Sequence, residues 1–333
     1  MIEKDRITIT GLCEKANKIP AEAVEELRAS GSPRRYYRVK TGKQTLIACC
    51  SENVEENEVF IQMSEMLAGG GVAVPSVFAA TAEKDCYLQE DLGEEDLMGE
   101  IKRAHNDQET WRHIDEAIEE LVKLQTLPAS KWENTVGFEP LGEQLIDYDF
   151  QYAVDNLIEP AGVSYDKDAL KKEMSDLKQR LLAYPQRLWG LMYRDFQSRN
   201  IMIKERPYLI DFQSARKGPG IYDLVSFAWQ AKAGFTPEER DRIVEIYVKR
   251  LSDRGIEAET EVKLELGYWV IFRIMQTLGA YGLRGLKEGK QHFIQSIPGA
   301  LRNLVECLKR KELKGRYPEL ERIAIQLGEK FRD

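Results

Sequence analysis

Residues 191–214 read LMYRDFQSRNIMIKERPYLIDFQS and contain two short apolar runs, Ile201–Ile203 and Tyr208–Ile210. A charged turn with one proline separates the runs, a pattern that predicts a β-hairpin. Such a hairpin places Asn200, which precedes its first strand, beside Asp211, which follows its second strand. An amide oxygen beside a carboxylate offers hard oxygen ligands of the kind that Mg²⁺ takes in phosphoryl-transfer sites. The stretch therefore predicts a metal and phosphate site.

A third candidate residue, Asp195, lies in the loop before the hairpin, five residues ahead of Asn200. The spacing alone decides nothing, because chance produces it about once in a chain of this length. The conjunction of this loop aspartate with Asn200 and with Asp211-Phe212 resembles the catalytic segment of the protein-kinase-like phosphotransferases. In that arrangement Asp195 is the candidate base. The alternative is a surface hairpin with ordinary acidic turn residues.

Length and composition narrow the class of protein. The chain has 333 residues, which is enough for two domains, and a net charge of -8. Negative charge argues against nucleic acid as the main partner, because phosphate binding needs a basic surface. No uninterrupted apolar run approaches the roughly 20 residues of a membrane span, and the start MIEKDRITITG lacks the apolar region of a signal peptide. We therefore expect a cytoplasmic protein that binds neither nucleic acid nor membrane.

Cysteine and histidine usage gives little support to metal or nucleophile chemistry. The five cysteines show neither C-x-x-C nor Cys/His metal spacing, so we expect reduced, buried thiols. They are Cys13, Cys49, Cys50, Cys86 and Cys307. The three histidines lie in stretches of helical pattern far from any motif, which disfavours a histidine-based hydrolase.

The N-terminal part reads as a sheet with a small-residue loop. A weak helix over 3–17 precedes predicted strands at Val24–Leu27, Tyr36–Lys40 and Thr45–Cys50. The loop between the first two strands lets backbone N–H groups approach anionic oxygens, with an arginine to add charge. An ordinary hairpin loop is an equal alternative. The candidate phosphate-binding residues of this loop are Ser30, Gly31, Ser32, Arg34 and Arg35.

A helix and a hinge complete the predicted N-terminal lobe. Apolar residues at helical spacing predict one main helix over Glu55–Leu67 after the third strand. A later strand, Cys86–Glu90, runs into Asp91-Leu92-Gly93. The backbone of Glu90 and Leu92 is the candidate contact for a nucleotide base, and a plain strand end with a glycine turn is the alternative.

The rest of the chain is mostly helical. We therefore expect an α+β, two-lobed fold with a small antiparallel-sheet lobe over residues 1–92 and a larger helical lobe over 93–333 that carries the catalytic loop and the acceptor site. After the hairpin, Asp223 is expected as a helix N-cap or as a buried hydrogen-bond acceptor that fixes the catalytic loop. The predicted helices cover 95–104, 108–125, 142–157, 168–184, 237–252, 259–284, 289–310 and 319–330.

The length of the connection between Gln213 and Tyr222 distinguishes a small-molecule kinase from a protein kinase. Only eight residues intervene, whereas protein kinases use a longer activation segment to hold a peptide. At about 3.3 Å for each extended residue, so short a connection cannot form that platform. The acceptor is therefore expected to be a small molecule.

Several segments together carry a resemblance to a known family. The chain resembles the aminoglycoside phosphotransferase superfamily, which has a protein-kinase-like fold, and within it is most similar to the anomeric N-acetylmuramate and N-acetylglucosamine kinases of cell-wall recycling. The resembling segments are Ser32–Val39, Gln89–Gly93, Tyr193–Phe196 with Asn200, Asp211–Gln213, Gly218–Ser226 and, more loosely, Arg273–Lys290.

The resemblance implies a role for each candidate residue. Asp195 would orient the acceptor hydroxyl and accept its proton, while Asn200 and Asp211 would hold Mg²⁺ on the phosphates of ATP. Arg194 and Asp223 would support the catalytic loop. The implied enzyme is a cytoplasmic small-molecule kinase that phosphorylates a sugar or amino sugar as a monomer or weak dimer.

Departures from the family pattern leave two alternatives open. The third strand lacks the lysine that kinase-like enzymes place there, and Glu58 loses its obvious partner. The sugar kinases that the chain resembles also lack this lysine, so its absence does not by itself indicate an inactive enzyme, and Arg34 and Arg35 are the candidates to substitute for it. Tyr193 stands where many members have histidine, and the helix after Asp223 lacks the acid expected for sugar hydroxyls. One alternative is a non-catalytic nucleotide-binding regulator. The other is an aminoglycoside or choline kinase, which needs an acidic pocket for its cationic acceptor.

Overall fold

A computed structural model describes most of the chain, and contacts divide it into two compact units. The described residues are 2–17, 20–27, 34–42, 44–135 and 138–332. The first unit is Met1–Phe138 with Arg199–Ala215, and the second is Glu139–Ser198 with Arg216–Asp333. These units divide the chain elsewhere than the predicted boundary after residue 92. The assignment of one lobe to the nucleotide and the other to the acceptor stays a prediction.

The first unit is built on an antiparallel sheet with the strand order β1-β2-β3-β5-β4. The strands predicted from β-branched and aromatic runs are present, with ends that differ by up to three residues. Helix α2, Val54–Gly69, follows β3 as predicted. The strands are β1 Ala21–Glu26, β2 Arg35–Thr41, β3 Thr45–Cys50, β4 Val77–Ala80 and β5 Cys86–Glu90.

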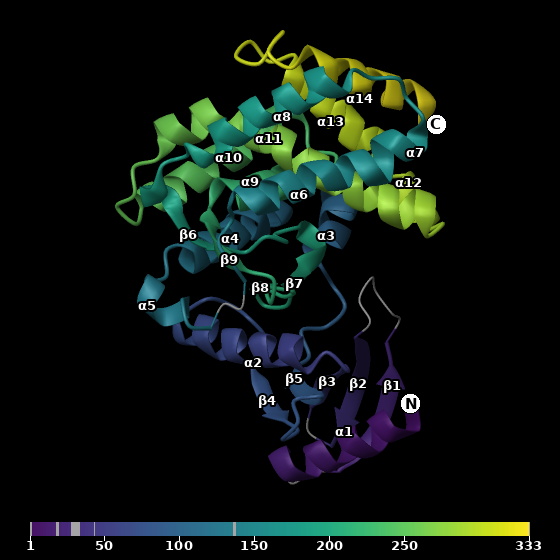
Figure 1. The fold of residues 1–333 in the computed structure, drawn as a ribbon. Coiled ribbons are helices and arrows are strands. Elements are labelled where there is room, and N and C mark those ends of the chain that lie inside the picture. Colours follow the sequence, from purple (N-terminus) through teal and green to yellow (C-terminus); the bar gives the residue numbers. More distant parts are fainter. Residues whose placement is uncertain (1, 18–19, 28–33, 43, 136–137, 333) are drawn as a thin grey trace. The chain divides into compact units, whose positions relative to one another are not determined.

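Alternation along the strands gives the sheet two different faces. Helix α1, Ile2–Asn17, crosses one face and packs its Ile9 against a core that includes Tyr37 and Leu88 (Figure 1). On the other face, the ring of Phe60 from α2 stacks on Tyr87 with centroids 5.1 Å apart. The face of the sheet that carries Tyr37 therefore packs against α1, and the face that carries Tyr87 packs against α2.

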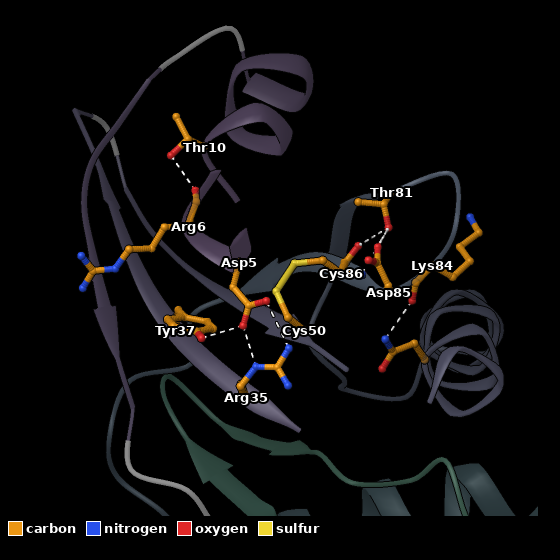
Figure 2. The surroundings of a disulfide bond; sticks show 11 residues. Asp5, Arg6, Thr10, Arg35, Tyr37, Cys50, Thr81, Lys84, Asp85 and Cys86 are labelled. Carbon is orange, nitrogen blue, oxygen red and sulfur yellow. Dashed lines mark hydrogen bonds and ion pairs between the residues drawn. A yellow bond between two sulfur atoms is a disulfide. The ribbon is translucent and has the colours of Figure 1, made fainter. Parts of the chain in front are cut away.

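The expectation that all cysteines are reduced is wrong for one pair. Cys50 and Cys86 lie opposite each other on β3 and β5 and are joined by a disulfide on the face that α1 covers (Figure 2). The pairing depends on strand register, which a separation of 36 residues in the sequence does not reveal. The remaining cysteines, Cys13, Cys49 and Cys307, are buried and free.

The predicted hairpin is present in the first unit. Strands β7, Ile201–Ile203, and β8, Pro207–Leu209, pair in antiparallel register. The backbone N–H of Leu209 donates to the carbonyl of Ala73, and that of Ile203 donates to the carbonyl of Glu95, both at 2.8 Å. These bonds fix the hairpin to the chain that leaves α2 and β5. The same unit contains helices α3 Leu97–Ala104, α4 Gln108–Gln125 and α5 Ala129–Trp132.

The second unit is helical around α11, Glu259–Tyr281. Tyr268, Trp269, Phe272 and Met275 recur at helical spacing along α11 and are buried in the core of this unit. Two short strands, β6 Trp189–Met192 and β9 Arg216–Pro219, pair in this unit. The other long helices are α6 Glu143–Ala153, α8 Lys167–Leu182, α9 Ile221–Ala228, α10 Pro237–Ser252, α13 Ile297–Leu308 and α14 Pro318–Lys330.

Three of the predicted helices are divided or pass into a π-helical turn, and the helix expected over 168–184 is α8, which ends at Leu182. The helix expected over 289–310 is two helices, α12 Gln291–Ile294 and α13, because Pro298 has no N–H to donate within a continuous helix and begins the second one instead. The helices expected over 142–157 and 259–284 pass into π-helical turns, Val154–Ile158 and Gly282–Lys287. Within the described part of the chain, no helix has the length and apolar character that crossing a membrane requires.

Candidate active site

The hairpin brings Asn200 and Asp211 together, as its sequence predicts. The amide Nδ2 of Asn200 donates to Oδ2 of Asp211 at 3.4 Å. The backbone N–H of Ile210 also donates to the carbonyl of Asn200 at 3.0 Å. Both residues belong to the first unit, so their pairing is defined within one compact body. Their role as metal ligands stays a prediction.

The backbone of Asp211 is held in a conformation that aspartate rarely adopts. Its φ is 67°, in the left-handed region. Strained residues of this kind persist where the surroundings over-determine them, and they cluster at functional sites. The next residue, Phe212, is fully buried and stacks on Phe60 of α2 with centroids 4.8 Å apart. Packing of Phe212 on α2 thus helps to hold Asp211 in place.

The donor set around Asp211 fits Mg²⁺ that is also bound to nucleotide phosphates. Asn200 and Asp211 offer an amide oxygen and a carboxylate, which are ligands that Mg²⁺ prefers. In the described ranges no group of three or more His, Cys, Asp or Glu side chains can hold a metal alone. Phosphate oxygens would therefore complete the coordination.

The two arginines at the start of β2 have different environments. Arg34 is buried and forms an ion pair with Glu56 of α2, with Nη2 and Oε1 3.0 Å apart. Arg35 donates to both carboxylate oxygens of Asp5 on α1, at 2.6 and 3.1 Å (Figure 2). Arg34 is thus the arginine that remains a candidate on the nucleotide side. The loop residues Ser30, Gly31 and Ser32 lie outside the described residues.

The predicted hinge lies at the end of β5. The backbone N–H of Glu90 already donates to the carbonyl of Ser76 at 2.8 Å, so a base contact at Glu90 would have to use its carbonyl oxygen. The side chain of Leu92 is buried in a small cluster with Tyr208. Arg38 binds Asp91 between them, with Nε and Oδ2 2.9 Å apart. The segment is well anchored, and its contact with adenine stays a prediction.

In the second unit, Asp223 fixes the loop that carries Asp195. Its carboxylate is fully buried and accepts the backbone N–H groups of Tyr193 and Arg194, each at 2.8 Å. Of the two predicted roles Asp223 has that of a buried acceptor, because the N-cap of α9 is Gly220. Arg194 has a φ of 76°, so the loop is also strained directly before Asp195.

An arginine that the sequence analysis did not single out lies beside Asp195. Nη2 of Arg273, from α11, is 3.8 Å from Oδ1 of Asp195. The side chain of Arg273 is 7% exposed, and that of Asp195 is 36% exposed. Arg273 is held by a hydrogen bond from its Nε to the hydroxyl of Ser226 at 2.9 Å. Only the looser resemblance over Arg273–Lys290 pointed toward this residue, because α11 is far from the motif in sequence.

Three arginines and two carboxylates interact around this loop. Nη2 of Arg194 is 3.8 Å from Oδ2 of Asp149. Burial raises the pKa of Asp149, and the charges of the three arginines oppose that rise. Burial lowers the pKa of Arg216 to about 10, and repulsion from Arg194 adds to that effect. The five groups are Asp149 of α6, Arg194, Asp195, Arg216 of β9 and Arg273.

Sheet, hairpin and loop together define a kinase-like phosphotransferase, and comparison with known proteins agrees. A model of the phosphotransferase enzyme family matches residues 23–260. The chain belongs to this family, which confirms the resemblance found in the sequence, and it is a small-molecule kinase.

Two curated relatives match nearly the whole chain. An N-acetylmuramate/N-acetylglucosamine kinase of Pseudomonas aeruginosa is 24% identical over 327 residues, which cover 96% of this chain and 90% of the relative. A protein of the same name from Neisseria meningitidis is 24% identical over 292 residues, covering 86% of this chain and 84% of the relative.

Solved structures confirm the predicted fold class. A choline/ethanolamine kinase family protein from Mesorhizobium loti has a TM-score of 0.63 at 14% identity and covers 96% of this chain and 99% of its own. A spectinomycin phosphotransferase in complex with ADP and spectinomycin has a TM-score of 0.58 at 14% identity, covering 97% and 98% of the two chains. At this identity the similarity concerns the fold.

Proposed function

We propose that the protein transfers the γ-phosphate of MgATP to a hydroxyl group of an amino sugar of the N-acetylmuramate or N-acetylglucosamine type. The observation that carries the choice of acceptor is the charge around Asp195. The names of the two curated relatives support the same choice.

In this proposal each motif residue has one task. Asp195 orients the acceptor hydroxyl and accepts its proton while the hydroxyl oxygen forms a bond to the γ-phosphorus. The bond from that phosphorus to the bridging oxygen breaks, and ADP leaves with the electron pair. Asn200 and Asp211 would hold Mg²⁺, which neutralises charge on the phosphates. Positioning and charge neutralisation provide most of the acceleration.

The charges near Asp195 show no excess of acidic groups, which disfavours a cationic acceptor. With the carboxylate of Asp223, whose charge also acts on Arg194, the cluster holds three arginines and three carboxylates and has a formal charge of zero when all six groups are ionised. Choline and aminoglycosides are cations, and a site for them is expected to carry an excess of acidic groups. N-acetylglucosamine is neutral and N-acetylmuramate carries a carboxylate, so both are compatible with the cluster.

Support for Asp195 as the catalytic carboxylate comes from how it is held. Asp223 and the left-handed backbone of Arg194 fix the loop, and Arg273 lies against one oxygen of Asp195. The carboxylate nevertheless remains partly exposed. A fixed, accessible carboxylate is what a general base for an acceptor hydroxyl requires.

A substrate panel tests the proposal. ADP release would be measured with MgATP and, in separate reactions, N-acetylmuramate, N-acetylglucosamine, choline, homoserine and an aminoglycoside. We expect the highest kcat/KM for one of the two N-acetyl sugars. A higher kcat/KM for choline or the aminoglycoside would favour the cationic-acceptor alternative. Thermal stabilisation by ATP with no turnover of any compound would favour the non-catalytic regulator.

A further inference from the structure

Strand β3 offers no lysine, yet a cationic side chain interacts with Cys49 near the end of the strand. The strand reads Thr45–Cys50 without a basic residue. Tyr36 pairs with Cys49 across the β2–β3 ladder. Nη1 of Arg34 lies 3.5 Å from the hydroxyl of Tyr36, and its guanidinium also interacts electrostatically with Cys49. The positive charge that β3 lacks is thus supplied from the residue preceding β2.

Arg34 is held there by α2. Its side chain is 2% exposed, and its Nη2 lies 3.0 Å from Oε1 of Glu56. Its guanidinium carbon is 5.9 Å from the centroid of the Phe60 ring on the same helix. The carboxylate on α2 that pairs with the cation is therefore Glu56. An unpaired charge is costly in so buried a position, so the pairing with Glu56 offsets part of the cost of burying Arg34.

Glu56 links this ion pair to the predicted metal ligand. Nε2 of Gln213 lies 3.3 Å from Oε1 of Glu56 and 2.8 Å from Oδ1 of Asp211, and donates to both. The other oxygen of Asp211 accepts from Asn200 at 3.4 Å. Both carboxylate oxygens of Asp211 are thereby oriented by amide groups. The side chain of Gln213 is buried, with the residue 8% exposed, which limits its freedom to swing away.

We propose that Arg34, Glu56 and Gln213 form a positioning relay that holds Asp211 in the orientation needed for Mg²⁺-nucleotide, in place of a strand lysine. The proposal rests on the proposed use of MgATP and is independent of which acceptor is phosphorylated. All members of the relay, together with Asn200, belong to the first unit. Groups that orient a metal ligand typically change metal affinity 10- to 100-fold, as an order of magnitude, when they are removed.

A purely structural role for the same contacts leads to a different prediction. If the ion pair only fastens α2 to the sheet, its loss lowers stability without changing the Mg²⁺ dependence of nucleotide binding. The neighbouring Arg35, which is the first residue of β2, provides a matched control, because it is also an ion-paired arginine. Its partners are Asp5 and α1 on the other face of the sheet (Figure 2).

The experiment measures binding without any acceptor. Affinity for the non-hydrolysable ATP analogue AMP-PNP would be measured by calorimetry over a series of Mg²⁺ concentrations for wild type, Arg34→Gln, Arg34→Lys, Gln213→Ala and Arg35→Gln. We expect Arg34→Gln and Gln213→Ala to raise the Mg²⁺ concentration for half-maximal binding at least about tenfold. Arg34→Lys keeps the charge and is expected to restore part of the loss. Arg35→Gln is expected to keep the wild-type Mg²⁺ dependence.

Folding of each variant would be checked by circular dichroism and thermal unfolding. Wild-type Mg²⁺ dependence in a folded Arg34→Gln protein, or an equal change in Arg35→Gln, would overturn the proposal. If Arg34→Gln does not fold, Gln213→Ala decides, because it removes the link to Asp211 without leaving Glu56 unpaired. Wild type that binds AMP-PNP with Mg²⁺ but phosphorylates no N-acetyl sugar contradicts the proposed acceptor and leaves the relay result intact.

Discussion

Replacement of Asp223 by asparagine tests how the catalytic loop is held. The buried carboxylate accepts two backbone N–H groups, one from Tyr193 and one from Arg194. An asparagine has one acceptor oxygen, and its amide group would face the second N–H donor. One buried donor then loses its partner, which costs about 1–3 kcal/mol. Alanine would orphan both donors and cost about 2–6 kcal/mol, so asparagine is the better choice for keeping the protein folded.

The effect is local and is best measured by hydrogen exchange. A cost of about 1–3 kcal/mol corresponds to a loss of protection of about 5- to 150-fold at the loop amides. Exchange of a peptide that covers Tyr193 and Arg194 would be followed by mass spectrometry in wild type and Asp223→Asn. An Asp176→Asn variant, which changes an exposed carboxylate paired with Arg316, serves as control. Unchanged exchange at the loop in Asp223→Asn would refute the proposed anchoring.

Three further predictions concern other contacts. Arg273→Gln should lower kcat about tenfold or more in steady-state assays with little change in KM for ATP, because it removes the cation beside Asp195 and leaves the first unit intact; a rise in KM for ATP alone would contradict this role. Burial raises the pKa of Asp5, but hydrogen bonds from Arg35 and Tyr37 outweigh it and hold that pKa below its usual range. The stabilisation by Asp5 is therefore present above about pH 4 and is lost as the pH falls through its lowered folded-state pKa. The difference in unfolding free energy between wild type and Asp5→Asn should then shrink between pH 7 and 3. A constant difference would contradict the pairing. The disulfide of Cys50 and Cys86 joins residues 36 apart, so reduction should lower the unfolding free energy by about 3–4 kcal/mol; equal denaturation midpoints with and without dithiothreitol would contradict that contribution.

The site residues that are neighbours in the sequence could be predicted from the sequence. The hairpin, the adjacency of Asn200 and Asp211, and the bounds of β3 and α4 all follow from local patterns of apolar residues and turns. These patterns act over a few residues, so the information for them is present in a single stretch of chain.

The contacts that could not be predicted depend on how helices and strands that are distant in sequence are packed together, and the helix ends depend on local interruptions. Arg273 reaches Asp195 from a helix whose rotation about its axis the sequence does not specify. The choice of Arg34 over Arg35 depends on which face of β2 each side chain occupies. The Cys50–Cys86 pairing likewise requires the order of β3 and β5 in the sheet. Pro298 is a local cue of another kind, because a proline without an N–H is sufficient to divide the helix expected over 289–310.

Different parts of the chain supply the two halves of the proposed chemistry. The first unit supplies the candidate ligands of Mg²⁺-nucleotide, and the second unit supplies Asp195 with its arginine-rich surroundings. The absent strand lysine motivated the regulator alternative. A relay through Arg34 offers a physical reason why this chain can use nucleotide without that lysine.

Direct detection of the product is the sharpest test of whether the protein is an amino-sugar kinase. The protein would be incubated with MgATP and N-acetylmuramate or N-acetylglucosamine, and the mixture analysed by ³¹P NMR and mass spectrometry, with Asp195→Asn in parallel. We expect a monophosphorylated sugar and stoichiometric ADP with wild type, and at most trace product with Asp195→Asn. Absence of any phosphorylated sugar, or equal product from Asp195→Asn, would contradict the proposed function.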